Sequence, residues 1–249
     1  MLVKKPNYKI ALIALVVLLF LGLGAGYYYM RGQKHAAVMG EMPPAPHSIL
    51  IIDPGHGGAD GGAISITGVH ESEINLQIAL VLEQLTALYG IPTEMTRRTA
   101  ELDYPEDADS IRAKKVADTR ARVALINEQT NAVVLSIHQN TYGAASVAGP
   151  QVLFAATDGS EAFAEFVQNA LIAALEGTGL EQTRKVARVP RDVYLMNHIT
   201  APAVLVECGF LTNPREEEML QTPAYQLRLA AALLSAYIAA RDSLWAGVT

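Results

Sequence analysis

Short apolar runs alternate along this chain with longer segments whose apolar residues recur at helical spacing. The first run, residues 48–53, ends at Pro54-Gly55, which is typical of a buried strand that stops at a turn. After it, apolar residues recur at i, i+4, i+7 and i+8 from Ile74 up to Gly90, which predicts an amphipathic helix. Further strands are predicted at residues 93–96, 132–137, 151–155 and 203–208, and further helices at 111–128, 161–175 and 225–241.

This alternation predicts an α/β fold, with a mostly parallel twisted sheet covered by helices on both faces. A chain of 249 residues has material for one sizeable domain, expected at residues 48–249, and a short extra segment. Ligands of such sheets bind outside the carboxyl ends of the strands. Polar residues just beyond a strand are therefore the first candidates for a functional site.

The extra segment lies at the amino end. Residues 10–30 contain no charged side chain, and about 20 apolar residues suffice for a helix to cross a bilayer. Three lysines in residues 1–9 place that end in the cytoplasm, so we expect one transmembrane helix and a domain tethered to the outer face of the cytoplasmic membrane. A cleaved signal peptide is the alternative, because Leu23-Gly24-Ala25 resembles a cleavage site, and the domain would then be secreted.

A linker is expected between this segment and the domain. Residues 31–47 include three closely spaced prolines, which favour an extended, semi-rigid chain.

Charge and cysteine content narrow the possible partners. Residues 1–40 hold five of the 19 basic residues and none of the 25 acidic ones, so the rest of the chain carries a formal charge of −11. Nucleic acid is excluded as a partner for such an acidic surface. Cys208 is the only cysteine, so no internal disulfide can form and the core must stabilise the fold.

Four polar residues occupy positions suited to chemistry. His56 follows the first strand, His138 ends the strand at 132–137, and Glu71 opens the first long helix. Glu207 interrupts an otherwise apolar strand, and a buried carboxylate without a partner is costly. Three of them also have a purely structural interpretation. The histidines could simply form hydrogen bonds at strand ends, and Glu71 could simply interact favourably with the helix dipole.

Two histidines and a carboxylate, with a fourth position open to water, are a common ligand set for catalytic zinc. His56, Glu71 and His138 fit this set. One zinc ion there would lower the pKa of water from about 15.7 to roughly 7 and would polarise a substrate carbonyl. Glu207 would then serve as general base and later as general acid.

Four sequence blocks also resemble one enzyme family in order and spacing. They are Asp53-Pro54-Gly55-His56-Gly57-Gly58, then Gly68 with Glu71, then Ser136-Ile137-His138-Gln139-Asn140, then the stretch from Val206 to Pro214. Across residues 48–240 the chain resembles the zinc-dependent N-acetylmuramoyl-L-alanine amidases, and Arg122 and Asn127 look like that family's Arg and Asn. The resemblance implies zinc ligation by His56, Glu71 and His138 and catalysis by Glu207.

The resemblance also implies the substrate, which is the amide between N-acetylmuramic acid and L-alanine in peptidoglycan, with its glycan strand and peptide stem. Three positions depart from the family pattern, namely Ser72, Gln139 and Cys208, but none removes a ligand or the base. His70, beside Glu71, is a weak rival ligand.

Within the family, the chain looks most like the germination-specific amidases of spore cortex. That likeness implies a part in forming muramic-δ-lactam and an activating protein partner. The loop at residues 141–149 is too short for the autoinhibitory helix of division amidases. Near the predicted site, four residues are candidates for holding glycan or peptide, although a solvated surface loop explains them equally well: Arg184, Arg188, Arg191 and Tyr194.

Three other functions remain open. The chain could be a vegetative cell-wall amidase, or an inactive, tethered glycan-binding scaffold. It could also be a cysteine peptidase with Cys208 as nucleophile. Adjacent residues in a strand point to opposite faces, so Cys208 faces away from the site if Glu207 faces it.

Overall fold

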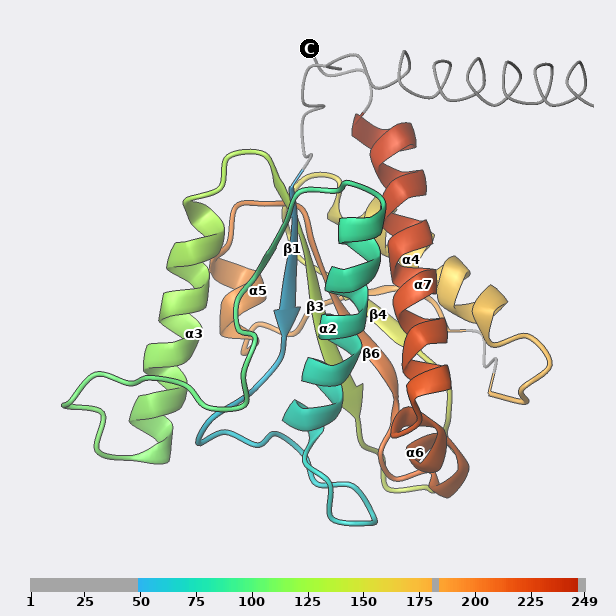
Figure 1. Ribbon diagram of the computed structural model, residues 1–249, viewed down its shortest axis with the longest axis horizontal. Coiled ribbons are helices and arrows are strands. Elements are labelled where there is room, and N and C mark those ends of the chain that lie inside the picture. The colour runs from blue at the N-terminus through green and yellow to red at the C-terminus, as the bar shows by residue number, and fades with distance from the viewer. Residues whose placement is uncertain (1–48, 181–183, 246–249) are drawn as a thin grey trace, which may run out of the picture. The chain divides into compact units, whose positions relative to one another are not determined.

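The computed structural model describes residues 49–180 and 184–245 as an α/β domain (Figure 1). The strands are β1 (Ile49–Pro54), β2 (Thr93–Met95), β3 (Ala132–Asn140), β4 (Gln151–Phe154), β5 (Ala187–Arg188) and β6 (Ala203–Phe210). The helices are α2 (Glu71–Leu88), α3 (Ile111–Asn127), α4 (Ser160–Ala174), α5 (Tyr194–His198), α6 (Pro214–Leu220) and α7 (Pro223–Ala240), followed by a π-helical turn, η1 (Arg241–Trp245).

The six strands form one mixed sheet in the order β2-β1-β3-β6-β4-β5. The pairs β1–β2, β1–β3 and β3–β6 are parallel, whereas β4 runs antiparallel to β6 and carries β5 with it. The expectation of a mostly parallel sheet therefore needs correction at this edge. A parallel return needs a crossover of a dozen or more residues, usually with a helix. Residues 141–150, between β3 and β4, form no helix, and β4 runs back in the opposite direction.

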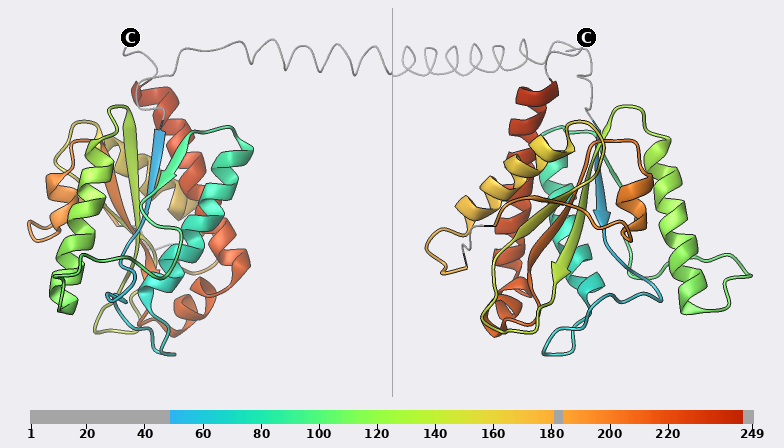
Figure 2. Two further views of the ribbon diagram at one scale, coloured as in Figure 1. Left: turned by 60° about the vertical axis from the view of Figure 1, so that its left-hand side comes forward. Right: turned by 180° about the vertical axis from the view of Figure 1, so that it is seen from behind.

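Alternate residues of the central strands pack against two different layers of helices. Leu50, Ile52, Val133, Leu135 and Val206 belong to a large apolar cluster with α2, α4 and α7. The residues between them belong to a second cluster with α3 and α5, which includes Ile51, Val134, Ala203, Leu205 and Ile126. The left view of Figure 2 shows the strands between α3 on one side and α2 and α7 on the other. Helices cover both faces, as the near-continuous apolar strands predict.

All the predicted strands and long helices are present, with ends that differ by a few residues. Four short elements escaped prediction: β5, α5, α6 and η1. None is long enough to show an apolar period of its own. Among the described residues, no helix is long and apolar enough to cross a membrane. The transmembrane helix expected at residues 10–30 and the linker at 31–47 lie outside the described residues.

A buried ion pair joins the end of β1 to α3. Arg122 Nη1 donates to Asp53 Oδ1 at 2.8 Å, and both side chains are at most 5% exposed. Asp53 also accepts hydrogen bonds from the hydroxyls of Ser136 and Thr96. Burial alone would raise the pKa of Asp53, but Arg122 and the two hydroxyls lower it to about 2.

We expect Asp53→Asn to lower the free energy of unfolding by about 3–5 kcal/mol at pH 7, because it leaves the Arg122 guanidinium buried without its counter-charge. The pKa of Asp53 falls from 3.8 to about 2 on folding, so ionised Asp53 stabilises the fold above pH 3.8 by about 2 kcal/mol, and acidification towards pH 2 removes this stability. Urea unfolding at pH 7, 4 and 2.5 measures both effects.

Arg98→Gln is the matched control. It breaks the exposed pair between Arg98 and Glu83, so it should cost less than about 1 kcal/mol. Equal destabilisation by the two substitutions would contradict the structural role of the buried pair.

Candidate metal centre

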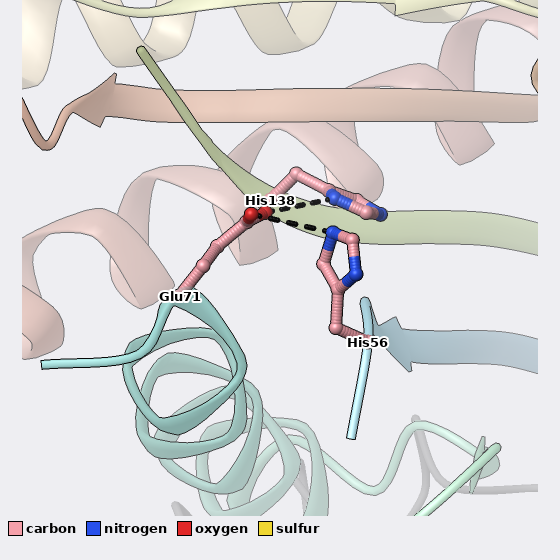
Figure 3. Close-up of side chains that lie close together, drawn as sticks. All are labelled: His56, Glu71 and His138. Carbon is pink, nitrogen blue, oxygen red and sulfur yellow. Dashed lines mark hydrogen bonds and ion pairs between the residues drawn. The ribbon is translucent and has the colours of Figure 1, made fainter. Parts of the chain in front are cut away.

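Three side chains from separate segments converge at the carboxyl edge of the sheet (Figure 3). His56 follows β1, Glu71 is the first residue of α2, and His138 lies on β3. One nitrogen from each histidine and one carboxylate oxygen lie within 4.8 Å of one another. His56 Nε2 is 3.3 Å from Glu71 Oε2, and His138 Nδ1 is 3.0 Å from Glu71 Oε1. The trio predicted from the sequence is thus brought together: the two rings lie edge to face, with centroids 4.9 Å apart, and each contacts one oxygen of the Glu71 carboxylate.

Glu71 is held by hydrogen bonds from the surrounding backbone. The Ala63 N–H donates to Oε2 at 3.0 Å, and the Gln139 N–H donates to Oε1 at 3.1 Å. Asn75, one turn along α2, adds a side-chain N–H at 3.3 Å. Burial would raise the pKa of Glu71, but its hydrogen bonds to His138 and His56 lower it well below its ordinary range. Glu71 therefore presents a fixed negative charge to both rings.

The second nitrogen of His56 is also fixed. His56 Nδ1 donates to Asp60 Oδ2 at 2.9 Å, and Asp60 in turn pairs with Lys115 at 2.8 Å. Histidines that bind metals usually donate their other N–H to a carboxylate in this way, which sets the tautomer and the ring orientation. Burial would lower the pKa of His56, but Glu71 and Asp60 raise it overall.

The backbone at His56 is strained. His56 is the one non-glycine residue with a positive φ, 60°, among the described residues. That region is sparsely populated by residues with a side chain and costs of order 1–3 kcal/mol. Arg122 supports the conformation, because its Nη2 donates to the His56 carbonyl oxygen at 2.7 Å. The buried ion pair of the fold therefore also holds a residue of the site.

Two glycines leave the space that the three side chains fill. A Cβ built on Gly55 would lie 2.2 Å from His138 Nε2. A Cβ on Gly62, whose φ is +70°, would lie 2.6 Å from Glu71 Oε2 and 2.8 Å from the His56 ring. Such distances are incompatible with the present side-chain positions, so these glycines are needed for the site itself.

Glu207 lies beside the trio. It pairs in register with His138 across β3 and β6, so both side chains leave the same face of the sheet. The residue is partly exposed, yet its Oε2 atom is buried without a hydrogen-bond partner among the described residues. Burial raises the pKa of Glu207 to about 7. The same edge thus holds two different carboxylates. The low pKa of Glu71 keeps it ionised, whereas the pKa of Glu207 lies near neutral pH.

A cleft of about 330 Å³ opens over these residues. Its floor includes His56, His138 and Glu207, and its walls come from α3 and from the segment around α5. The residues lining these walls include Lys115, Asp118, Thr119, Asp192, Tyr194 and Met196.

The other residues considered from sequence are scattered. Tyr194 lines the cleft, whereas Arg184 donates to the Gly149 carbonyl oxygen and lies over the Phe210 ring. Arg188 and Arg191 are exposed and do not line the cleft. Asn127 ties the end of α3 to His198 and Thr200.

Two rival residues do not join the site. His70 is exposed at the start of α2 and lies outside the group of three. Cys208 is fully buried in the cluster beneath α2 and α7, and burial raises the pKa of its thiol. The expectation that Cys208 faces away from Glu207 is confirmed.

Sequence reasoning missed three supporting residues. Asp60 orients His56, Asn75 contacts Glu71, and Arg97 donates to the carbonyl oxygens of Pro54, Gly55 and Ser72. Asp60 and Asn75 each lie four residues after a candidate ligand, which is a usable signal for Asn75 because residues i and i+4 share a helix face. Nothing in the sequence around Arg97 indicates its buried position.

The arrangement fits a metal ion. Two imidazole nitrogens and a carboxylate oxygen match the donor set of catalytic metal sites, one histidine already has its outer carboxylate, and a buried carboxylate lies alongside.

Comparison with known proteins identifies the family of the chain. Residues 50–239 match the family model for N-acetylmuramoyl-L-alanine amidase. The germination-specific N-acetylmuramoyl-L-alanine amidase of Bacillus subtilis is 31% identical over 231 residues, which cover 92% of each chain. AmiA of Escherichia coli is 27% identical, with 76% of this chain and 75% of AmiA covered.

Solved structures of amidases have the same fold. The CwlD amidase of Clostridioides difficile, in complex with the GerS lipoprotein, has a TM-score of 0.73 and 28% identity, covering 79% of this chain and 99% of CwlD. The catalytic domain of CwlV from Bacillus (Paenibacillus) polymyxa has a TM-score of 0.66 and 26% identity, covering 78% and 98%. The chain therefore belongs to the N-acetylmuramoyl-L-alanine amidases, which are hydrolases of peptidoglycan.

We expect His56→Ala and His138→Ala to lose at least about 100-fold in metal affinity, because the loss of an outer-shell partner alone costs 10–100-fold. The affinity is measured as the amount of metal bound per chain after dialysis against a metal-buffered solution. His70→Ala removes a neighbouring exposed histidine and should keep full occupancy. Undiminished binding by both ligand variants would rule out the assignment.

Gly55→Ala should also weaken metal binding, because its methyl group displaces the His138 ring. The matched control is Gly143→Ala, since a Cβ at Gly143 meets no atom within 4 Å. Metal titration of the two variants, with circular dichroism to verify folding, tests this. Equal affinities would show that the His138 ring has room to move.

Proposed function

We propose that the chain is a single-zinc amidase in which His56, Glu71 and His138 hold the ion and Glu207 is the catalytic carboxylate. The observation that carries this proposal is the convergence of three donors beside a carboxylate whose buried oxygen has no partner in the described part of the chain. The bond cleaved is the amide between the lactyl group of N-acetylmuramic acid and L-alanine, in keeping with the family.

Zinc, when bound, supplies Lewis-acid activation of the substrate carbonyl and of the attacking water. The chain provides the rest. The Glu207 carboxylate takes a proton from the water and returns it to the departing amine nitrogen, a task suited to a carboxylate with a pKa of about 7. Glu71 remains ionised throughout, and the Asp60 carboxylate keeps the His56 ring in one orientation.

The biological setting that we propose is spore cortex maturation, including formation of muramic-δ-lactam, and germination. The likeness to the germination-specific amidase of Bacillus subtilis over 92% of both chains supports it. The likeness to CwlD, solved in complex with a lipoprotein, supports an activating protein partner here. A vegetative wall substrate is the alternative within the same chemistry.

For localisation, we propose that the enzyme acts outside the cytoplasm, tethered by residues 10–30 or released if this segment is cleaved. The uncharged stretch and the lysines before it support export, and a peptidoglycan substrate requires it. In this proposal, residues 48–249 form the catalytic domain and 31–47 the linker.

Two rival functions fare less well. A cysteine peptidase would need an accessible thiol, and Cys208 is fully buried on the opposite face from Glu207. A scaffold that only binds glycan has no use for a carboxylate, beside three metal donors, whose buried oxygen finds no partner in residues 49–180 and 184–245, because such a group costs stability.

The decisive experiment compares Glu207→Gln with the parent protein. The variant should bind zinc normally but release stem peptides from purified peptidoglycan at least about 100-fold more slowly, because proton transfer by a placed side chain contributes 10²–10⁴-fold. Released peptides are quantified by chromatography, with and without a chelator. Glu73→Gln, an exposed carboxylate in the first turn of α2, is the control.

Near-normal hydrolysis by Glu207→Gln would contradict the assignment of Glu207 as the general base. Chelator-resistant hydrolysis would exclude the zinc mechanism. Parallel assays on spore cortex and on vegetative wall discriminate the two settings, and faster release from cortex is expected.

A further inference from the structure

A second hollow adjoins the metal-site cleft along α3. It has a volume of about 370 Å³ and is lined by Arg112, Lys115, Val116, Thr119 and Arg120 of α3 and by Tyr194 of α5. Three of these residues, Lys115, Thr119 and Tyr194, also line the cleft over the metal centre. We call this hollow the α3 groove. The α3 groove therefore lies directly beside the cleft in which the reaction would take place.

The α3 groove is positively charged in an acidic protein. Arg112, Lys115 and Arg120 line it, and no acidic side chain of the described residues does, although the chain as a whole has a net charge of −6. Lys115 pairs with Asp60, the partner of His56. Among the residues that the structure describes, neither Arg112 nor Arg120 has an acidic partner. Two arginines are thus available to an anionic ligand.

The two arginines lie on the same face of α3. Arg112, Val116 and Arg120 are each four residues apart, so they lie on one face of α3. At 1.5 Å per residue, the two arginines are about 12 Å apart along the helix. An extended peptide of three residues spans about 10 Å, so it can reach from one arginine to the other.

Tyr194 forms the apolar wall of the groove. Its side chain is 41% exposed, and its ring stacks on His198 with centroids 3.8 Å apart and planes at 16°. Val116 on the opposite helix is 42% exposed. A ring held in this way offers a flat surface to the backbone and aliphatic atoms of a ligand at little entropic cost.

We propose that the α3 groove binds the peptide stem of the substrate, with Arg112 and Arg120 pairing its carboxylates and Tyr194 packing against its backbone. This inference rests on the proposed amidase function. N-acetylated sugars carry no ionisable group, and the muramoyl carboxyl is consumed in the scissile amide. The carboxylates of the substrate therefore lie in the stem, and the bidentate geometry of arginine suits them.

The test uses the full chain and the probe N-acetyl-L-alanyl-γ-D-glutamyl-meso-diaminopimelate, whose acetyl group mimics the lactyl amide. A second probe has the same sequence with every carboxylate amidated. Calorimetry should show tighter binding of the acidic probe, with about a tenfold loss in Arg112→Gln and in Arg120→Gln. Arg228→Gln, an exposed arginine on α7, removes the same charge elsewhere and should bind as the parent does.

Equal binding of the two probes, or parent-like binding of the acidic probe by the Arg112→Gln, Arg120→Gln double variant, would overturn the inference. Hydrolysis separates it from the proposed function. If the groove binds stems, the double variant should raise KM for soluble muropeptides and leave kcat nearly unchanged. A parent protein that binds the acidic probe through these arginines but cleaves no wall would uphold the groove and refute the amidase mechanism.

Discussion

The buried pair between Asp53 and Arg122 is the interaction on which the rest of the structure depends. It joins the end of β1 to α3, and the same guanidinium donates to the carbonyl oxygens of Pro54 and His56. One side chain thereby fixes a strand end, a helix and the strained backbone of a candidate metal ligand. The site is consequently tied to the sheet edge that carries it, and such anchoring favours catalysis by preorganised groups.

Two carboxylates at this edge have opposite electrostatic environments. Glu71 is surrounded by donors and faces two imidazoles, so its pKa is held low. Glu207 lies on the neighbouring strand β6, and its buried oxygen meets no donor among the described residues. Burial raises its pKa to about 7. The number of hydrogen-bond donors around each acid thus helps to set its pKa. Glu71 has several donors and is suited to hold a cation, whereas Glu207 has few among the described residues and is suited to move a proton.

The sequence was sufficient to predict the α/β class and the gathering of the four candidate residues at one edge of the sheet, because strand and helix periods are local. The two histidines come at strand ends, Glu71 opens a helix and Glu207 interrupts an apolar strand. The sequence was insufficient where long-range packing decides. The reversed direction of β4 follows from the link that precedes it, and the burial of Arg97 follows from carbonyl groups that only the folded chain gathers. Asn127, noted with Arg122 by resemblance, donates to the carbonyl oxygen of His198 at the end of α5, a contact that the sequence does not indicate.

Successive side chains of β6 point to opposite faces of the sheet. The carboxylate of Glu207 and the thiol of Cys208 are therefore adjacent in sequence but lie on opposite sides of the sheet. Cys208 is the only cysteine of the chain and is fully enclosed beneath α2 and α7. A modifying reagent can therefore reach its sulfur only when that apolar layer opens. The rate of its labelling records how often the core opens, and comparing that rate with and without metal would express the coupling between the site and the core as a free energy.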